Sequence, residues 1–144
     1  MTRNTISIEI KKQTFQALVD SGASSSVISY AVVKRLQIPV QTIHPDEIIN
    51  VHVADGRSVT VIGKAELCVK INGLSMPCEF LILPHIGYSL ILGLDFLAAN
   101  KAQIDFANGV VTFFDNLTAA NLSTSNQSRL INSVCTNYNI TTLF

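Results

Sequence analysis

One carboxylate in this 144-residue chain is placed as a catalytic acid would be, directly after an apolar pair and before a turn of small residues. The acid is Asp20, and Ser21 and Gly22 follow it at once. A buried strand that ends on an aspartate holds the carboxylate rigidly, and the glycine lets another backbone or a ligand come close. Apolar sequence resumes at Val27, so the turn is fixed at both ends. The pattern predicts a rigid loop that presents one acid.

Residues 18–26, Leu-Val-Asp-Ser-Gly-Ala-Ser-Ser-Ser, resemble the active-site loop of aspartic proteases, and of retropepsins in particular. Residues 90–97, Leu-Ile-Leu-Gly-Leu-Asp-Phe-Leu, look like the retropepsin segment that packs behind that loop. Asp-Ser-Gly by itself often marks only an Asx-turn or a helix cap. The two segments together, at this separation, favour the protease interpretation over about residues 5–115.

The resemblance implies a role for each residue of the two segments. Asp20 would be the catalytic carboxylate, with Ser21, Gly22 and Ala23 forming the active-site loop. Ser21 would bond to the same loop of a second subunit. The residues expected to support the loop from behind are Ile91, Leu92 and Gly93.

A single Asp-Ser-Gly in so short a chain predicts assembly from two copies. Amide hydrolysis by this route needs two carboxylates that share a proton around one water. Pepsin-type enzymes carry two such loops in a chain about twice as long, so a C2 homodimer is expected, with Asp20 of each subunit meeting on the axis. The predicted function is an aspartic endopeptidase that processes a retrovirus-like or retrotransposon polyprotein. The alternatives are a non-catalytic retropepsin-like interaction or dimerisation module, and a retropepsin-like protease domain captured by a host protein.

A hairpin is predicted where retropepsins carry the flap that closes over the substrate. Strands at residues 48–54 and 58–62 flank an Asp-Gly turn. An ordinary surface hairpin would have the same pattern, and the multi-glycine tip of many retroviral flaps is missing. The residues expected to contact substrate are Val53, Ala54, Asp55, Gly56, Arg57 and Ser58.

Alternating apolar and polar residues predict strands along most of the chain. Ile6, Ile8 and Ile10 give the first example. Together with the resemblance, these short hairpins predict an all-β fold, the closed barrel-like retropepsin fold, with one short helix after Leu92. Ser29 can also cap a short helix over residues 30–36. Asp95, in the helix after Leu92, is interpreted as a capping acid and not as a second catalytic carboxylate.

Composition predicts a single folded unit followed by a tail. Residues 1–115 form the predicted protease domain, whereas residues 116–144 are rich in Asn, Ser and Thr and contain one charged side chain, Arg129. So few apolar residues cannot form a core of their own, which predicts a flexible tail or linker.

Charge and composition narrow the possible partners. Ten basic and ten acidic side chains cancel, so no nucleic-acid-binding surface is expected, and the apolar runs are too short to span a membrane. The three cysteines and three histidines show no ligand spacing, so neither a metal nor another cofactor is expected. The N-terminal residues do not resemble a signal peptide, and the expected location is the cytoplasm, including virus-like particles. A serine hydrolase is disfavoured because Ser26 stands where the Gly-x-Ser-x-Gly motif requires its second glycine.

Overall fold

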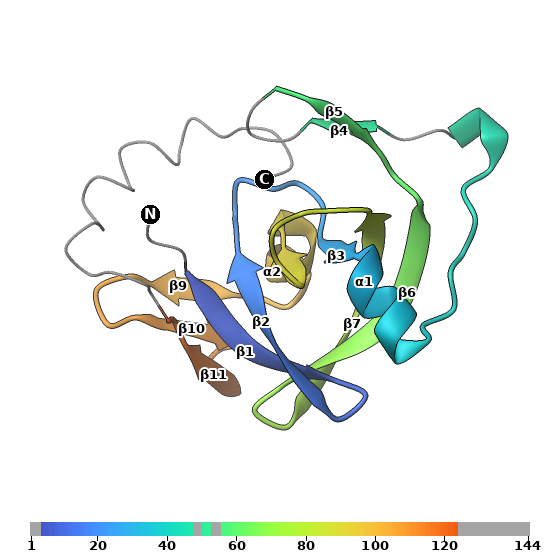
Figure 1. Cartoon of the computed structure of the whole chain (residues 1–144). Helices are drawn as coiled ribbons and strands as arrows, with labels where there is room; N and C mark the ends of the chain where they lie inside the picture. The colour runs from blue at the N-terminus through green and yellow to red at the C-terminus, as the bar shows by residue number, and fades with distance from the viewer. Residues whose placement is uncertain (1–3, 48–49, 53–55, 124–144) are drawn as a thin grey trace.

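The computed structural model describes residues 4–47, 50–52 and 56–123, and six strands among them close into a barrel (Figure 1). The strands follow one another around the barrel in the order β1-β2-β8-β3-β7-β6. Their bounds are β1 Thr5–Ile10, β2 Gln13–Val19, β3 Val27–Ser29, β6 Gly63–Ile71, β7 Leu74–Leu83 and β8 Leu90–Leu92.

The barrel core follows from the alternation in the sequence. Ile6, Ile8 and Ile10 are at most 2% exposed, and the polar residues between them face outward. Ile8 lies opposite the buried Phe15 of β2, so both strands turn apolar side chains to the same interior. A strand with one apolar face is stable only when that face is covered, and closure of the barrel covers it. The predicted closed, retropepsin-like fold is confirmed.

Strand β8 lies between β2 and β3, although it comes far later in the sequence. It runs parallel to β2, with Val19 opposite Leu92, and antiparallel to β3, with Val27 opposite Ile91. The loop that joins β2 to β3 therefore has to pass over the end of β8. This topology brings the two segments of the sequence resemblance together.

Two short α-helices are present in the described residues, both where the sequence places them. Helix α1 spans Tyr30–Leu36, and the hydroxyl of Ser29 caps it by accepting a hydrogen bond from the amide of Val32. Helix α2 spans Leu94–Ala99 and starts directly after β8. A single 3-10 turn, η1, covers Pro45–Glu47. No helix in the described ranges is long and apolar enough to cross a membrane.

A separate hairpin lies over the end of the barrel where the β2–β3 loop runs (Figure 1). It consists of β4, Asn50–His52, and β5, Ser58–Thr60, with Val51 opposite Val59. Both strands fall within the predicted segments. Gly56, before β5, has φ +90°, a conformation that favours glycine.

The C-terminal part of the described chain forms a second sheet, of β9 Gln103–Asp105, β10 Val110–Phe113 and β11 Thr118–Asn121. Strand β11 lies beyond the predicted domain end at residue 115, and it is held in place. The hydroxyl of Thr118 donates to the carbonyl of Ile71, Asn72 donates to the carbonyl of Ala119, and Ser123 bridges to Thr5. Residues 118–123 are therefore not part of a free tail. The rest of the predicted tail, 124–144, lies outside the described residues.

Candidate active site

The β2–β3 loop presents Asp20 at the end of the barrel, at the point where β2 stops. The amide of Asp20 donates to the carbonyl of Leu92 at 3.0 Å, which fixes the backbone to β8. The amides of Gly22 and Ala23 fold back onto Asp20, bonding to Oδ1 at 2.9 Å and to the carbonyl oxygen at 3.1 Å. Asp20 is half-buried, Ser21 and Gly22 are exposed, and Ala23 is fully buried. The carboxylate is thus fixed by its backbone and still reachable from solvent.

The end of β8 passes so close to the loop that only glycine fits there. A Cβ on Gly93 would lie 2.7 Å from the carbonyl oxygens of both Ala23 and Ser25, well inside van der Waals contact. The next amide, that of Leu94, donates to the carbonyl of Ala23 at 2.7 Å. Ile91 and Leu92 are buried in β8. Leu92 and Gly93 thus contact the backbone of the loop, and Ile91 packs in one cluster with Ala23.

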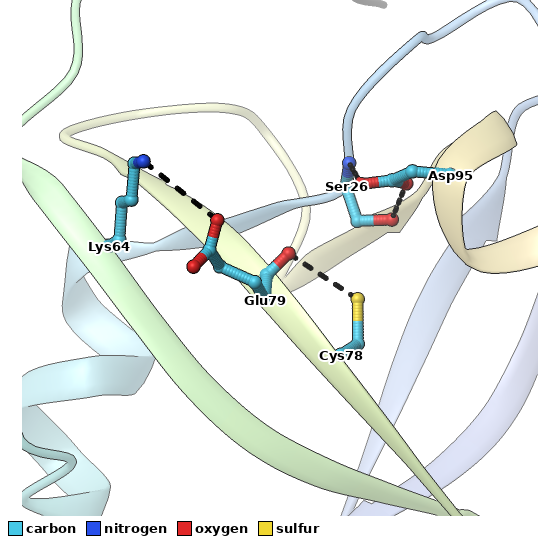
Figure 2. A network of polar contacts seen from close by, with 5 residues as sticks. All are labelled: Ser26, Lys64, Cys78, Glu79 and Asp95. Atoms are coloured by element: carbon cyan, nitrogen blue, oxygen red, sulfur yellow. Dashed lines mark hydrogen bonds and ion pairs between the residues drawn. The ribbon is translucent and has the colours of Figure 1, made fainter. Parts of the chain in front are cut away.

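A pair of polar side chains that the sequence did not reveal joins the loop to helix α2. Ser26, fully buried, donates its amide to Asp95 Oδ2 at 3.1 Å and its hydroxyl to Asp95 Oδ1 at 2.6 Å (Figure 2). The same hydroxyl accepts the amide of Gly93 at 2.9 Å. Asp95 does lie in the first turn of α2, but Gly93 is the N-cap residue and the carboxylate is turned to the loop. Asp95 Oδ1 also accepts the amide of Phe96 at 2.7 Å, so the acid does bond to the first turn of its helix as predicted, and its two bonds to Ser26 are an additional contact that the sequence did not predict.

No local signal could have paired Ser26 with Asp95. The two residues are 69 positions apart, and each has an adequate explanation in its own segment, as a loop serine and as an acid near a helix start. Only the insertion of β8 between β2 and β3 brings them into contact. The best available signal was the position of Asp95 two residues after Gly93, in the segment expected to pack behind the loop.

A thiol lies against this pair, and its surroundings keep it protonated. Burial, followed by the negative charge of Asp95, raises the pKa of Cys78 to about 12. Its sulfur donates to the carbonyl of Glu79 at 3.4 Å, and Glu79 makes a 3.9 Å ion pair with Lys64 (Figure 2). A neutral thiol is a poor nucleophile and metal ligand, so Cys78 acts here as an apolar filler.

The β4–β5 hairpin shares an apolar cluster with the loop that carries Asp20. Val51 and Val61, in and just after the hairpin, are buried together with Ala23, Val27 and Ile91. Partly buried side chains also pack against this cluster, from β2, the segment after α1, the hairpin, β7 and the β7–β8 connection; they are Leu18, Ile43, Val59, Leu81, Ile86 and Tyr88. We call the buried residues, Ala23, Val27, Val51, Val61, Leu83 and Ile91, the loop-side cluster. It joins the active-site loop to the hairpin through apolar side chains.

Of the six residues predicted to contact substrate from the hairpin, three are described. Ser58 begins β5, and Gly56 and Arg57 precede it. Val53, Ala54 and Asp55 lie outside the described residues. Substrate contact by these residues stays a prediction. In the described ranges, no three or more His, Cys, Asp or Glu side chains gather as a metal site would require.

Solved structures with the same fold include a retroviral protease-like domain and a viral protease. The retroviral protease-like domain of Ddi1 from Leishmania major superposes with a TM-score of 0.69 at 22% identity, covering 88% of this chain and 98% of that domain. EIAV protease, solved in complex with the inhibitor HBY-793, gives a TM-score of 0.58 at 22% identity, covering 72% of this chain and 93% of its own.

Curated proteins of similar sequence carry this segment within much longer chains. DNA damage-inducible protein 1 of Kluyveromyces lactis is 29% identical over 110 residues, which are 76% of this chain and 26% of that protein. Protein DDI1 homolog 2 of Homo sapiens is 30% identical over 116 residues, 74% of this chain and 26% of its own. The chain thus spans about a quarter of the length of these relatives.

The family model described as retroviral aspartyl protease matches residues 4–119, from the start of β1 into β11. That range contains the loop with Asp20, the β8 segment that supports it, and the hairpin above it. The chain belongs to the retroviral aspartyl protease family.

Proposed function

We propose that this protein is an aspartic endopeptidase whose active site forms between two copies of the chain, with Asp20 of each as the catalytic pair. The observation that carries the proposal is the position of Asp20, fixed to β8 through its amide yet half-exposed, in a loop whose Ala23 shares an apolar cluster with Val51 of the hairpin. Membership of the retroviral aspartyl protease family supports the same reaction.

The chemistry needs one proton shared between the two carboxylates. The ionised Asp20 accepts a proton from the attacking water, and the protonated Asp20 of the other subunit donates to the oxygen of the scissile carbonyl. Two carboxylates a few ångström apart cannot both ionise cheaply, so the pair holds this single proton over a range of pH. The amine leaves after it receives a proton from the pair.

One chain presents one such loop, which is why the proposal requires a homodimer. Ser21 is exposed next to Asp20, where it can meet the loop of a second subunit. Leu94, just behind the loop, is a large apolar side chain that is 50% exposed. Burying it against a partner would remove apolar surface from water.

The loop-side cluster suggests the class of peptide that is cleaved. Apolar side chains of the substrate would pack against the partly exposed Val59, Ile86 and Tyr88 when the peptide lies across Asp20. Pockets of this kind select by size and apolarity, and they reject charged side chains that they would desolvate. We therefore propose cleavage between apolar residues of a peptide or protein.

Two settings remain for that activity. The residue pattern of the two active-site segments suggests a protease that processes a retrotransposon-like polyprotein. The resemblance to DNA damage-inducible protein 1 in two organisms favours the other setting, a retropepsin-like domain of a cellular protein. Of the two, we propose the second.

The test compares the protein with its Asp20→Asn variant on a peptide library. The parent protein should cleave between apolar residues, be blocked by a pepstatin-type inhibitor, and lose activity faster than linearly on dilution. The variant should remain folded, by circular dichroism, and be inactive. A folded parent protein that cleaves nothing while it still dimerises would favour the non-catalytic module, and an active monomer in sedimentation would refute the shared site.

A further inference from the structure

An open pocket of about 440 Å³ lies on the outer side of the β7–β8 connection, beside helix α1. Its walls come from strand β2, from α1 (cyan in Figure 1), and from the connection itself, residues 84–89. The volume is in the range of sites that hold small ligands or a few side chains of a peptide. The side chains that form it are Phe15, Ser29, Ala31, Val32, Arg35, Pro84, His85, Ile86, Tyr88 and Ser89.

The pocket combines apolar walls with positive charge. Arg35 extends over the ring of Phe15, with its Cζ 5.7 Å from the ring centroid, a stacking that holds the guanidinium in place while its edge can still donate hydrogen bonds. His85 is exposed nearby. No described residue of the lining carries a carboxylate. Such a site complements an anion that is attached to apolar groups.

Residues 124–144 include no Asp or Glu, and their one charged side chain is Arg129. A basic, amide-rich segment does not complement Arg35. Charge therefore points to a carboxylate-bearing segment of another protein.

The pocket and the proposed substrate site share one wall. Ile86 and Tyr88 line the pocket and also pack against the loop-side cluster that contains Ala23 and Ile91. A chain bound in the pocket therefore contacts the same connection that faces the peptide at Asp20. An extended polypeptide can span the two sites because each residue adds roughly 3.3 Å.

We propose that this pocket is an exosite that binds an acidic, apolar segment of the substrate protein, away from the bond that is cleaved. The proposal rests on the proposed endopeptidase function. It would let a site that selects only for apolar side chains at Asp20 favour particular proteins, since a second contact raises the effective concentration of the scissile bond.

Binding is tested first, in the catalytically inactive Asp20→Asn background. A random octapeptide display library is selected on the immobilised protein, and an enriched peptide is synthesised with a fluorescent label. We expect Glu or Asp next to Leu, Ile or Phe. Arg35→Gln should weaken binding of that peptide about tenfold, as expected for loss of one charge-assisted hydrogen bond. Ala31→Trp fills the pocket without changing its charge, and it should abolish binding of the peptide.

Lys70→Gln is the matched control, because it removes one exposed cation elsewhere on the barrel. It should leave the affinity within twofold. Failure to enrich acidic peptides, or equal affinity in Arg35→Gln and Lys70→Gln, overturns the exosite.

Cleavage is then measured on one scissile peptide with and without the selected segment appended. The appended segment should raise kcat/KM about tenfold, mainly through KM, in the parent protein but not in Arg35→Gln. The parent protein and Arg35→Gln should cleave the short peptide, which lacks the appended segment, equally. Equal cleavage of both substrates by the parent protein refutes the exosite alone, whereas no cleavage of the short peptide refutes the proposed function.

Discussion

Removing the carboxylate of Asp95 should loosen the active-site loop without touching Asp20 itself. In Asp95→Asn the side chain keeps its size, and Oδ1 can still accept the hydroxyl of Ser26. The amide nitrogen that replaces Oδ2 then faces the amide of Ser26, donor against donor, where a 3.1 Å hydrogen bond exists in the native protein. Because Asp95 is exposed on its other side, the lower end of the range for charged hydrogen bonds applies, about 1.5 kcal/mol.

Ser26→Ala should cost more, because its hydroxyl has two partners. It donates to Asp95 at 2.6 Å and accepts from the amide of Gly93 at 2.9 Å, and the residue is fully buried. Its loss leaves a buried amide without an acceptor, so we expect about 3 kcal/mol of destabilisation. In a double-mutant cycle, Ser26 and Asp95 should show a coupling energy of about 1–2 kcal/mol.

The effect on catalysis should appear in kcat. A loop that shifts by a fraction of an ångström to one ångström moves Asp20 relative to its partner, which is worth about ten- to a hundredfold in rate. KM should change little, because the apolar contacts to substrate remain. Urea denaturation at fixed protein concentration and steady-state peptide hydrolysis supply the two measurements.

Ser24→Ala serves as the control, since Ser24 is an exposed serine in the same loop. It should leave both stability and kcat close to those of the parent protein. Additive effects of Ser26→Ala and Asp95→Asn, or an unchanged kcat in both, would show that the pair does not position the loop.

Four further outcomes follow from Gly93, Cys78 and Asp105. Gly93→Ala should destabilise the fold by about 3 kcal/mol or more in thermal unfolding, because its Cβ would meet the backbone oxygen of Ala23 at 2.7 Å. Cys78 should react with iodoacetamide far more slowly than the exposed Cys68 at pH 8, which peptide mass spectrometry can resolve; equal rates would contradict its raised pKa. The pKa of Cys78 is about 12 in the folded protein, against an ordinary value of 9.0. The stabilising contribution of the neutral thiol is therefore complete below pH 9 and is lost as the pH rises toward 12. Cys78→Ala should remove this pH dependence from the alkaline denaturation curve. Hydrogen bonds from Asn108 lower the pKa of Asp105. The contribution of this carboxylate to stability is therefore present above its ordinary pKa of 3.8 and is lost as the pH falls further. Acid unfolding of Asp105→Asn should lack this pH dependence.

The strands of the barrel and the tight turn after Asp20 could be predicted from the local sequence. Alternation at Ile6, Ile8 and Ile10 reports which face of a strand is buried, and the small residues after Asp20 report a tight turn; both signals act over a few residues. The helix at residues 30–36 follows from its cap at Ser29 in the same way. The segment behind the loop was recognisable only through its resemblance to a family.

Contacts between distant segments depended on the tertiary structure. Insertion of β8 between β2 and β3 places Asp95 against Ser26, 69 residues away, and that contact adds to the bond that Asp95 accepts from Phe96 at the start of its own helix. The sheet that holds β11 in place is formed by pairing with β10 and by bonds to Ile71 and Thr5, so the folded part continues past the composition change at residue 115. Composition measures the average polarity of a segment, whereas its order depends on whether its backbone finds hydrogen-bond partners, and only the fold supplies those partners.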